Sequence, residues 1–301
     1  MLAVAIAAVA VARLAAPNGK RASFAPAVLG AQPPGAVVLA GEDRDLAVAL
    51  ALKPQRHDLL VVVTILGQSG GGADGLSTSV TVTTAGGRTV GSKAPAATLG
   101  TYQTVLAARG RPIRATVTVA GPGASNRPLV FTAPATWPPK PAATLLRTVD
   151  RVYGKLRTLV THERLASSPT NALISVYRAV APDSLTIDSS NGLHAVVIGR
   201  RRWDKTGAGG WRQSTQNPPV KAISPYWAGL IQDPTLLGST TLRGHHAWIV
   251  SFAAPQIPAF FQIDVDKQND RVLDLRMTAS AHFMHHRYGP FNTRIAIKPP
   301  R

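Results

Sequence analysis

Residues 271–292 read RVLDLRMTASAHFMHHRYGPFN, and this stretch decides how the second half of the chain is interpreted. From Leu273 to Phe283 every odd position is apolar, and a period of two is typical of a β-strand with one buried face. The alternation predicts one strand over residues 271–283 with its odd residues facing inward. If the strand continues, three further side chains share the opposite face, namely His282, Met284 and His286.

These three side chains have two interpretations. Imidazole and thioether groups are suitable ligands for Cu(I), so His282, Met284 and His286 form a candidate copper site. Alternatively, the same residues cover the outer surface of a sheet or pack under a helix. His245 and His246 are adjacent on a predicted strand and point to opposite faces, so they do not suit one ion. Copper is therefore a possible cofactor, but the sequence does not establish that any cofactor is bound.

Residues 23–137 consist of short apolar runs separated by glycine, proline and asparagine clusters. Leu59–Leu66 is a continuous apolar run rich in Val, whereas Ser77–Thr84 alternates Val with Ser or Thr. No window in this region shows a helical apolar stripe. The pattern predicts an antiparallel β-sandwich over residues 23–137. Residues 138–143 are rich in proline and are predicted to be a linker.

The period of the apolar residues changes after this linker. Over residues 144–165 they fall on one helical face, which predicts one long helix. At least seven strands follow, with a short helix predicted over Ser224–Leu230. The expected fold is therefore mostly β (α+β), an antiparallel sandwich followed by a curved antiparallel half-barrel sheet packed on one long helix, over residues 144–301.

A half-barrel of this kind leaves a concave apolar surface on which a ligand can bind. The predicted strands supply the inward-facing side chains, and alternation alone does not separate a cavity lining from a packed core. The residues expected to line that cavity or core are Phe261, Ile263, Val265, Leu273, Leu275, Met277 and Phe283.

One short motif raises the question of catalysis. Residues 67–71 read GQSGG and fit the G-x-S-x-G pattern of a nucleophile elbow. A real elbow lies between a strand and a helix, but here a second predicted strand follows. We therefore expect a loop at this position and a protein that is not an enzyme.

The first twelve residues, Met1–Ala12, are wholly apolar. They are too few to span about 30 Å of hydrocarbon, which needs ~20 residues. They fit the core of a signal peptide, although the basic residues that usually precede such a core are missing. Alternatively, residues 1–22 are the end of a truncated transmembrane segment. Either interpretation predicts an extracytoplasmic protein, whether membrane-anchored, periplasmic or at the cell surface.

The formal net charge of +18 favours an anionic partner. The chain carries no recognised nucleic-acid-binding motif, so an anionic membrane surface is the expected partner and nucleic acid is not. Basic and aromatic side chains at a sheet edge suit contact with a membrane or a phospholipid head group. The candidates for this contact are Arg200, Arg202, Trp203 and Arg212. The absence of cysteine excludes disulfides and thiolate metal sites.

Three stretches of the second half resemble the lipoprotein-carrier superfamily, which has the LolA and LppX-like fold. They are residues 175–183, residues 195–203, which end in a glycine, three arginines and a tryptophan, and residues 261–266 with the turn that follows. The closing stretch, residues 282–292, is similar to the exported C-terminal part of copper-resistance D-type membrane proteins. Those proteins carry transmembrane helices first, and some carry a copper-resistance C or YtkA-like sandwich, which residues 41–137 would suit.

The chain departs from these families at two points. The lipidated relatives of the carrier family need an N-terminal cysteine, which is absent here. Copper-binding sandwiches of the C type use histidine and methionine ligands, whereas residues 23–137 hold one histidine, His57, and no methionine. Copper binding by the first domain is therefore not expected.

The resemblance implies a non-enzymatic bacterial envelope protein that binds a hydrophobic or amphiphilic ligand, such as a lipid, in its half-barrel, in a copper-resistance context. One alternative is a copper-homeostasis module that uses the three residues at 282, 284 and 286. Another is a sensor of envelope stress that binds a membrane-protein partner through its sandwich. Transmembrane helices encoded upstream of Met1 would favour the copper-resistance D-type assignment.

Overall fold

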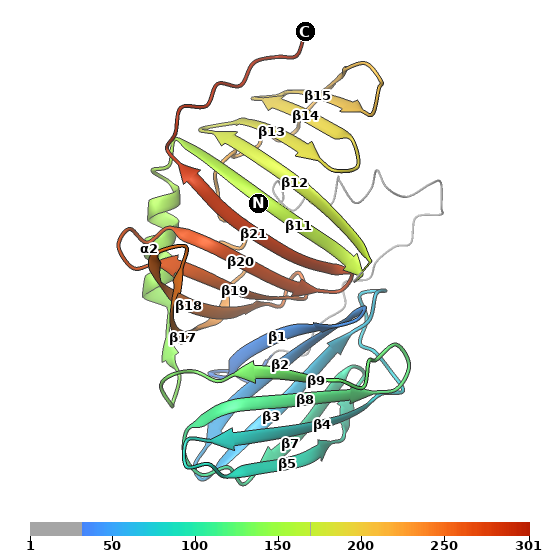
Figure 1. Cartoon of the computed structure of the whole chain (residues 1–301), viewed down its shortest axis with the longest axis vertical. Helices are drawn as coiled ribbons and strands as arrows, with labels where there is room; N and C mark the ends of the chain where they lie inside the picture. Colours follow the sequence, from blue (N-terminus) through green and yellow to red (C-terminus); the bar gives the residue numbers. More distant parts are fainter. Residues whose placement is uncertain (1–31, 169) are drawn as a thin grey trace.

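The computed structural model describes residues 32–168 and 170–301, in which nearly all regular structure is β-strand (Figure 1). The strands form three sheets, and the expected mostly-β fold of antiparallel sheets is confirmed. The predicted signal or transmembrane segment, residues 1–22, lies outside the described residues. Within the described part, no helix is both long and apolar enough to cross a membrane.

Two of the sheets pack face to face in the first part of the chain. One has the order β1 (Val37–Asp43), β2 (Leu46–Gln55), β3 (Asp58–Leu66), β7 (Thr101–Leu106), β6 (Ala96–Thr98). The other has the order β5 (Thr89–Ala94), β4 (Ser77–Thr84), β8 (Pro112–Ala120), β9 (Pro128–Thr132). On β4, Val80 and Val82 are fully buried between the sheets while Ser79 and Thr81 are exposed. This is the alternation that the sequence predicted.

The third sheet has twelve strands and occupies the rest of the chain. Its order is β10 (Lys140–Pro141), β17 (Gln232–Leu242), β18 (His245–Ala254), β19 (Ala259–Asp266), β20 (Val272–Ala279), β21 (His282–Phe291), β11 (Thr158–Ser168), β12 (Asn171–Val180), β13 (Ser184–Ser189), β14 (Leu193–Ile198), β15 (Arg201–Thr206), β16 (Arg212–Thr215). Helix α2 (Ala143–Tyr153) packs on one side of this sheet through Leu146, Val149 and Tyr153. We call this side the helix face and the other side the sandwich face.

The sandwich face is named for the β1–β2–β3 sheet that packs against it. On β2, Ala47, Ala49 and Ala51 point towards the twelve-stranded sheet, and the larger side chains between them point into the sandwich. The small alanines allow the two sheets to approach closely. Together with Val38, Val62 and other residues of the first part they enclose Phe260 and Phe283 of the twelve-stranded sheet. The β1–β2–β3 sheet is therefore buried on both faces.

The predicted helix over residues 144–165 is too long. The helix ends at Tyr153, Gly154 follows it, and strand β11 begins at Thr158. Leu156 and Leu159 fit the helical period, but they reach the same core from the turn and from the strand. The β-branched residues at 158, 160 and 161 favour the strand. The predicted short helix over residues 224–230 is also wrong, since that stretch forms turns.

The predicted single strand over residues 271–283 is two strands. β20 ends at Ala279, Ser280 and Ala281 form the turn, and β21 begins at His282. Within this turn Ala281 has a φ of 53°, a left-handed conformation that alanine rarely adopts. Because the turn has two residues, Met277 pairs with Met284, and the inward-facing positions change from odd on β20 to even on β21.

The proline-rich stretch between the two parts has regular structure. Strand β10 lies within it and pairs with β17, and the Ala135 amide donates to the Leu237 carbonyl at 2.7 Å. Trp137 packs against the core of the sandwich. The division of the chain into independent domains at residues 138–143 stays a prediction, but this stretch is paired with its surroundings.

The shared core predicts that Phe260 stabilises both parts at once. Phe260 is 2% exposed, so Phe260→Ala should lower the free energy of unfolding by about 3–5 kcal/mol. In chemical denaturation followed by tryptophan fluorescence and circular dichroism, the wild type should unfold in one transition. The control is Ile174→Ala, whose side chain is largely exposed and whose loss should change stability little. Separate transitions for the two parts in the wild type would contradict a shared core.

Candidate functional site

The helix face holds most of the residues predicted to line a cavity. Phe261, Ile263, Val265 and Leu275 are at most 3% exposed and share one apolar cluster with the helix. Met277 packs against the same cluster. These side chains form a packed layer, and their role as ligand contacts stays a prediction.

Two of the predicted cavity residues lie elsewhere. A bulge pairs Val265 with Val272, so Val272 takes the inward position and Leu273 lines a surface hollow of about 240 Å³. Phe283 lies in the cluster between the sandwich and the twelve-stranded sheet. Phe283 lies there because the two-residue turn before β21 changes the positions that face the helix from odd to even.

An irregular segment, residues 216–231, completes the cover of the helix face, and we call it the covering segment. It contains no helix or strand, yet Trp227 is 1% exposed. The Tyr226 and Trp227 rings pack edge to face with their centroids 5.2 Å apart, and the Tyr226 ring also lies 6.0 Å from that of Phe261. Within the sheet, Phe252 and Phe261 stack at 5.0 Å. The aromatic side chains of the covering segment therefore fill the space that a half-barrel leaves beside its sheet.

A buried polar network lies under this cover. Glu163 of β11 is 5% exposed and accepts two hydrogen bonds, from the Tyr177 hydroxyl at 2.8 Å and from His286 Nε2 at 2.6 Å. The Tyr288 hydroxyl lies 3.0 Å from His286 Nδ1. A buried carboxylate requires such partners, because burial without them costs several kcal/mol. Both ring nitrogens of His286 are therefore engaged within the protein.

Two tyrosine hydroxyls near this network have no partner among the described residues. They belong to Tyr153 on the helix and Tyr226 on the covering segment. The Tyr226 ring lies 5.9 Å from that of His286, and the Tyr153 ring lies 6.4 Å from that of Tyr288. Burial raises the pKa of both hydroxyls, so both stay protonated and can donate. Each of these buried hydroxyls is therefore a hydrogen-bond donor that is available to a ligand.

Sequence reasoning missed Glu163 and Tyr177. Glu163 fell inside the overlong predicted helix, where a charged residue on the outer surface is ordinary. In a strand, however, Thr161, Glu163 and Leu165 share one face, and a carboxylate on a buried face is unusual. Correct assignment of the strand would have made Glu163 a candidate.

The predicted copper ligands share one face of β21, but it is the helix face and not the opposite one, because the turn after β20 reverses the alternation. His286 is held by Glu163 and Tyr288, while His282 Nδ1 lies 3.1 Å from the Ser280 carbonyl oxygen. Met284 is 5% exposed and packs in the apolar cluster. Among residues 32–168 and 170–301, no group of three or more His, Cys, Asp or Glu side chains is placed to hold a metal. Copper binding at these residues stays a prediction.

The predicted membrane-contact residues are spread over the far edge of the large sheet. Arg200 and Arg212 are exposed, and Arg212 lies on the edge strand β16. Arg202 Nε and Nη2 donate to the Asp204 carboxylate at 2.8–3.0 Å, which offsets its charge. Trp203 is 8% exposed, with the Arg201 guanidinium 5.4 Å from its ring centroid.

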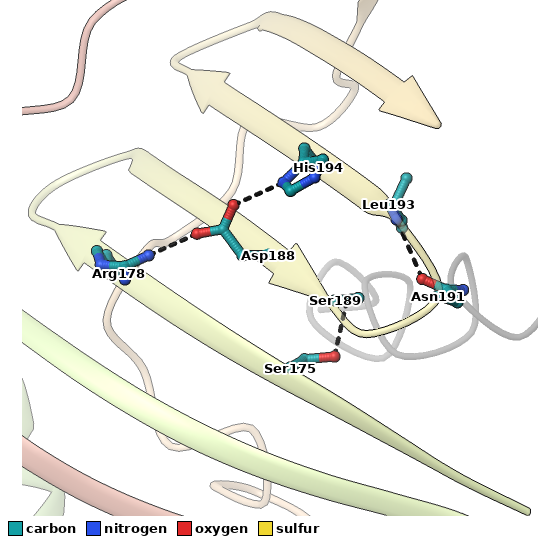
Figure 2. Close-up of polar contacts among 7 residues, drawn as sticks. All are labelled: Ser175, Arg178, Asp188, Ser189, Asn191, Leu193 and His194. Carbon is teal, nitrogen blue, oxygen red and sulfur yellow. Dashed lines mark hydrogen bonds and ion pairs between the residues drawn. The ribbon is translucent and has the colours of Figure 1, made fainter. Parts of the chain in front are cut away.

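A polar network joins strands β12, β13 and β14, which precede β15 and the edge strand β16 in the sheet order, and Figure 2 shows its side chains. Asp188 joins Arg178 at 2.5 Å and His194 Nδ1 at 2.9 Å. Burial alone would raise the pKa of Asp188, but the hydrogen bonds from His194 and Arg178 outweigh it and lower that pKa. On the same strands, the Ser175 and Ser189 hydroxyls bond to each other at 2.8 Å. The polar groups of this network are hydrogen-bonded to one another, and their contacts join strands β12, β13 and β14.

A second group of charged residues lies on the sandwich face. Asp264 and Asp274 are directly opposite on β19 and β20, and His285 Nε2 donates to Asp274 at 2.6 Å. One Asp264 oxygen is buried without a partner among the described residues. Burial, helped by the charge of Asp274, raises the pKa of Asp264 to about 6, although Arg276 and His285 oppose the shift.

This raised pKa predicts a pH-dependent stability. The folded state holds a proton on Asp264 up to about pH 6, whereas the unfolded chain releases it near pH 4, so stability falls as pH rises through this window. Asp264→Asn should therefore stabilise the protein at pH 8, on the order of 1–2 kcal/mol after allowance for solvent screening, and little at pH 4.

Thermal melting across pH 4–8 measures this effect, with the exposed Asp58→Asn as the control. An Asp264→Asn effect that is the same at every pH would show that folding does not raise the pKa of this carboxyl.

No family model matches the chain, and neither does any curated protein sequence. Lipoprotein LppX of Mycobacterium tuberculosis is similar over 52% of this chain and 97% of its own, at 9% identity and a TM-score of 0.41. LprF of Mycobacterium bovis is similar over 54% and 98%, at 11% identity and a TM-score of 0.38. A LolA superfamily protein of Nitrosomonas europaea is similar over 52% and 95%, at 10% identity and a TM-score of 0.27.

Proposed function

We propose that this chain is a non-enzymatic, extracytoplasmic binding protein that holds an apolar or amphiphilic molecule against the helix face of its large sheet. The observation that carries the proposal is the cover of that face. An eleven-residue helix and an irregular segment cover this face. The segment packs Tyr226 and Trp227 into the space where we propose that the ligand binds.

The covering segment has few backbone hydrogen bonds to the rest of the protein. The Gln216 amide donates to the Arg200 carbonyl at 2.8 Å, and the Ala222 amide donates to the Pro182 carbonyl at 3.0 Å. The bonds at Ala228 and Leu230 are local turns within the segment. A segment with few backbone bonds to its surroundings opens at a lower free energy than paired strands do. Its displacement would uncover a broad apolar surface without breaking the sheet.

The polar groups under the cover favour an amphiphile over a pure hydrocarbon. The Tyr153 hydroxyl is a buried donor without a described acceptor, and it belongs to the helix rather than to the segment that would move. The Glu163–His286 pair lies in the same layer. A ligand with an oxygen acceptor would satisfy the hydroxyl while its apolar part replaces the two aromatic rings.

The envelope location and the anionic membrane partner are part of the same proposal. The formal charge of +18 favours approach to a surface of acidic phospholipid. Exposed Arg200 and Arg212 are candidates for that contact. The neighbours named above include lipoprotein LppX and a LolA superfamily protein, and the proposal does not depend on them.

Ligand binding by Trp227→Ala tests the proposal. Removing this side chain should cost about 3–5 kcal/mol of stability and open space beside the sheet. Titration with the neutral apolar dye Nile red should then show tighter binding to the variant than to the wild type, because the dye no longer has to displace the indole. Native mass spectrometry of the full chain, purified without detergent, should show a bound apolar molecule on part of the wild type.

The matched control is Trp211→Ala, which removes an indole from outside the core clusters and should leave dye binding unchanged. If Nile red binds neither the wild type nor the folded Trp227→Ala variant, and no mass adduct is found, the proposed function is wrong.

A further inference from the structure

A groove of about 290 Å³ lies on the sandwich face, away from the helix-face site. One wall is the stretch Val38–Glu42 on strand β1, and the floor belongs to the twelve-stranded sheet. We call it the interface groove. Ligand sites commonly lie where two parts of a protein meet, and this volume is close to the lower end of their usual range.

The floor of the groove is a row of polar side chains that crosses five strands. Strand pairing places each member opposite the next, and the row is Arg164, His285, Arg276, Gln262 and Ser251. Adjacent strands are about 4.8 Å apart, so the row is ~19 Å long. Residues in register on adjacent strands share a face, and all five line the groove.

The two arginines on this row are open to a ligand. Arg164 and Arg276 are exposed, and neither makes a side-chain hydrogen bond or an ion pair with any described residue. His285 lies between them in the row, with Nε2 bound to Asp274 and Nδ1 without a described partner. Glu42 is the one acidic residue in the lining, and outside it Arg276 also interacts electrostatically with Asp264.

The other end of the row is closed and partly apolar. Ser251 is 2% exposed, and its hydroxyl has no hydrogen-bond partner among the described residues. Phe260 and Phe283, which are 2% and 5% exposed, also belong to the groove lining and are its aromatic part. A buried hydroxyl without a partner is unusual in a folded protein, and a ligand that reaches it would satisfy it.

We propose that the interface groove binds a small elongated organic anion, with its carboxylate or phosphate between Arg164 and Arg276 and its carbon chain along Phe260 towards Ser251. Guanidinium groups bind these two anions with short, charge-assisted hydrogen bonds. The anion comes either from a free molecule or from a lipid head group. This site lies on the opposite face of the sheet from the helix-face site, although Phe261, Met277 and Met284 border both, and its existence does not depend on the proposed function.

Isothermal titration of the full chain with sodium octanoate, and with neutral octanol of the same chain length, tests the inference. Octanoate should bind, and octanol should bind at least tenfold more weakly. Arg164→Ala and Arg276→Ala should each weaken octanoate binding roughly tenfold, and the double variant should abolish it, because each removes charge-assisted hydrogen bonds. The matched control is Arg287→Ala, an exposed arginine on the same face of β21 as His285 but outside the groove lining.

Vesicles of phosphatidylcholine with phosphatidylglycerol distinguish the two sources of the anion. If the protein binds these vesicles, and Arg164→Ala and Arg276→Ala weaken that binding more than Arg287→Ala does, the anion is a lipid head group. Octanoate binding without such vesicle binding identifies a free anion. Equal affinities for octanoate and octanol, or octanoate affinities unchanged by both groove substitutions, would overturn the inference.

Discussion

The burial of the β1–β2–β3 sheet on both faces is the constraint on which the rest of the structure depends. One face packs in the sandwich and the other packs on the twelve-stranded sheet. The sequence of β2 meets both requirements at once, with large side chains towards the sandwich and alanines towards the second sheet. A polar residue in place of Ala49 would destabilise this contact, because a buried polar group without a hydrogen-bond partner costs about 1–3 kcal/mol.

This arrangement leaves the two faces of the large sheet with different surroundings. The sandwich covers part of one face with a rigid sheet, and a polar groove stays open at the edge of the contact. A short helix and an irregular segment cover the other face, where apolar packing extends around a buried Glu163–His286 pair. We propose different ligands for the two faces, because one is covered by a sheet and the other by a segment with few backbone hydrogen bonds to its surroundings.

Much of the fold could be predicted from local patterns. The alternation on β4 and the apolar run of β3 predicted sandwich strands, and the odd apolar positions from 273 to 279 predicted β20. The errors arose where two elements share one core. Leu156 and Leu159 fit a helical stripe because the turn and strand after the helix face the same apolar layer as the helix does. Ala281 adopts a positive φ that its residue type disfavours, so no local signal indicated the hairpin turn.

The sequence by itself determined the alternation of each strand, the size of the side chains on each face and the excess of positive charge. Only the tertiary structure decided that His286 meets Glu163 and Tyr177, since strand β21 pairs with β11 although the two are more than a hundred residues apart in the chain. It also decided that Arg164 and Arg276 border one groove. The physical reason is strand register, which depends on long-range pairing that no local stretch of sequence encodes.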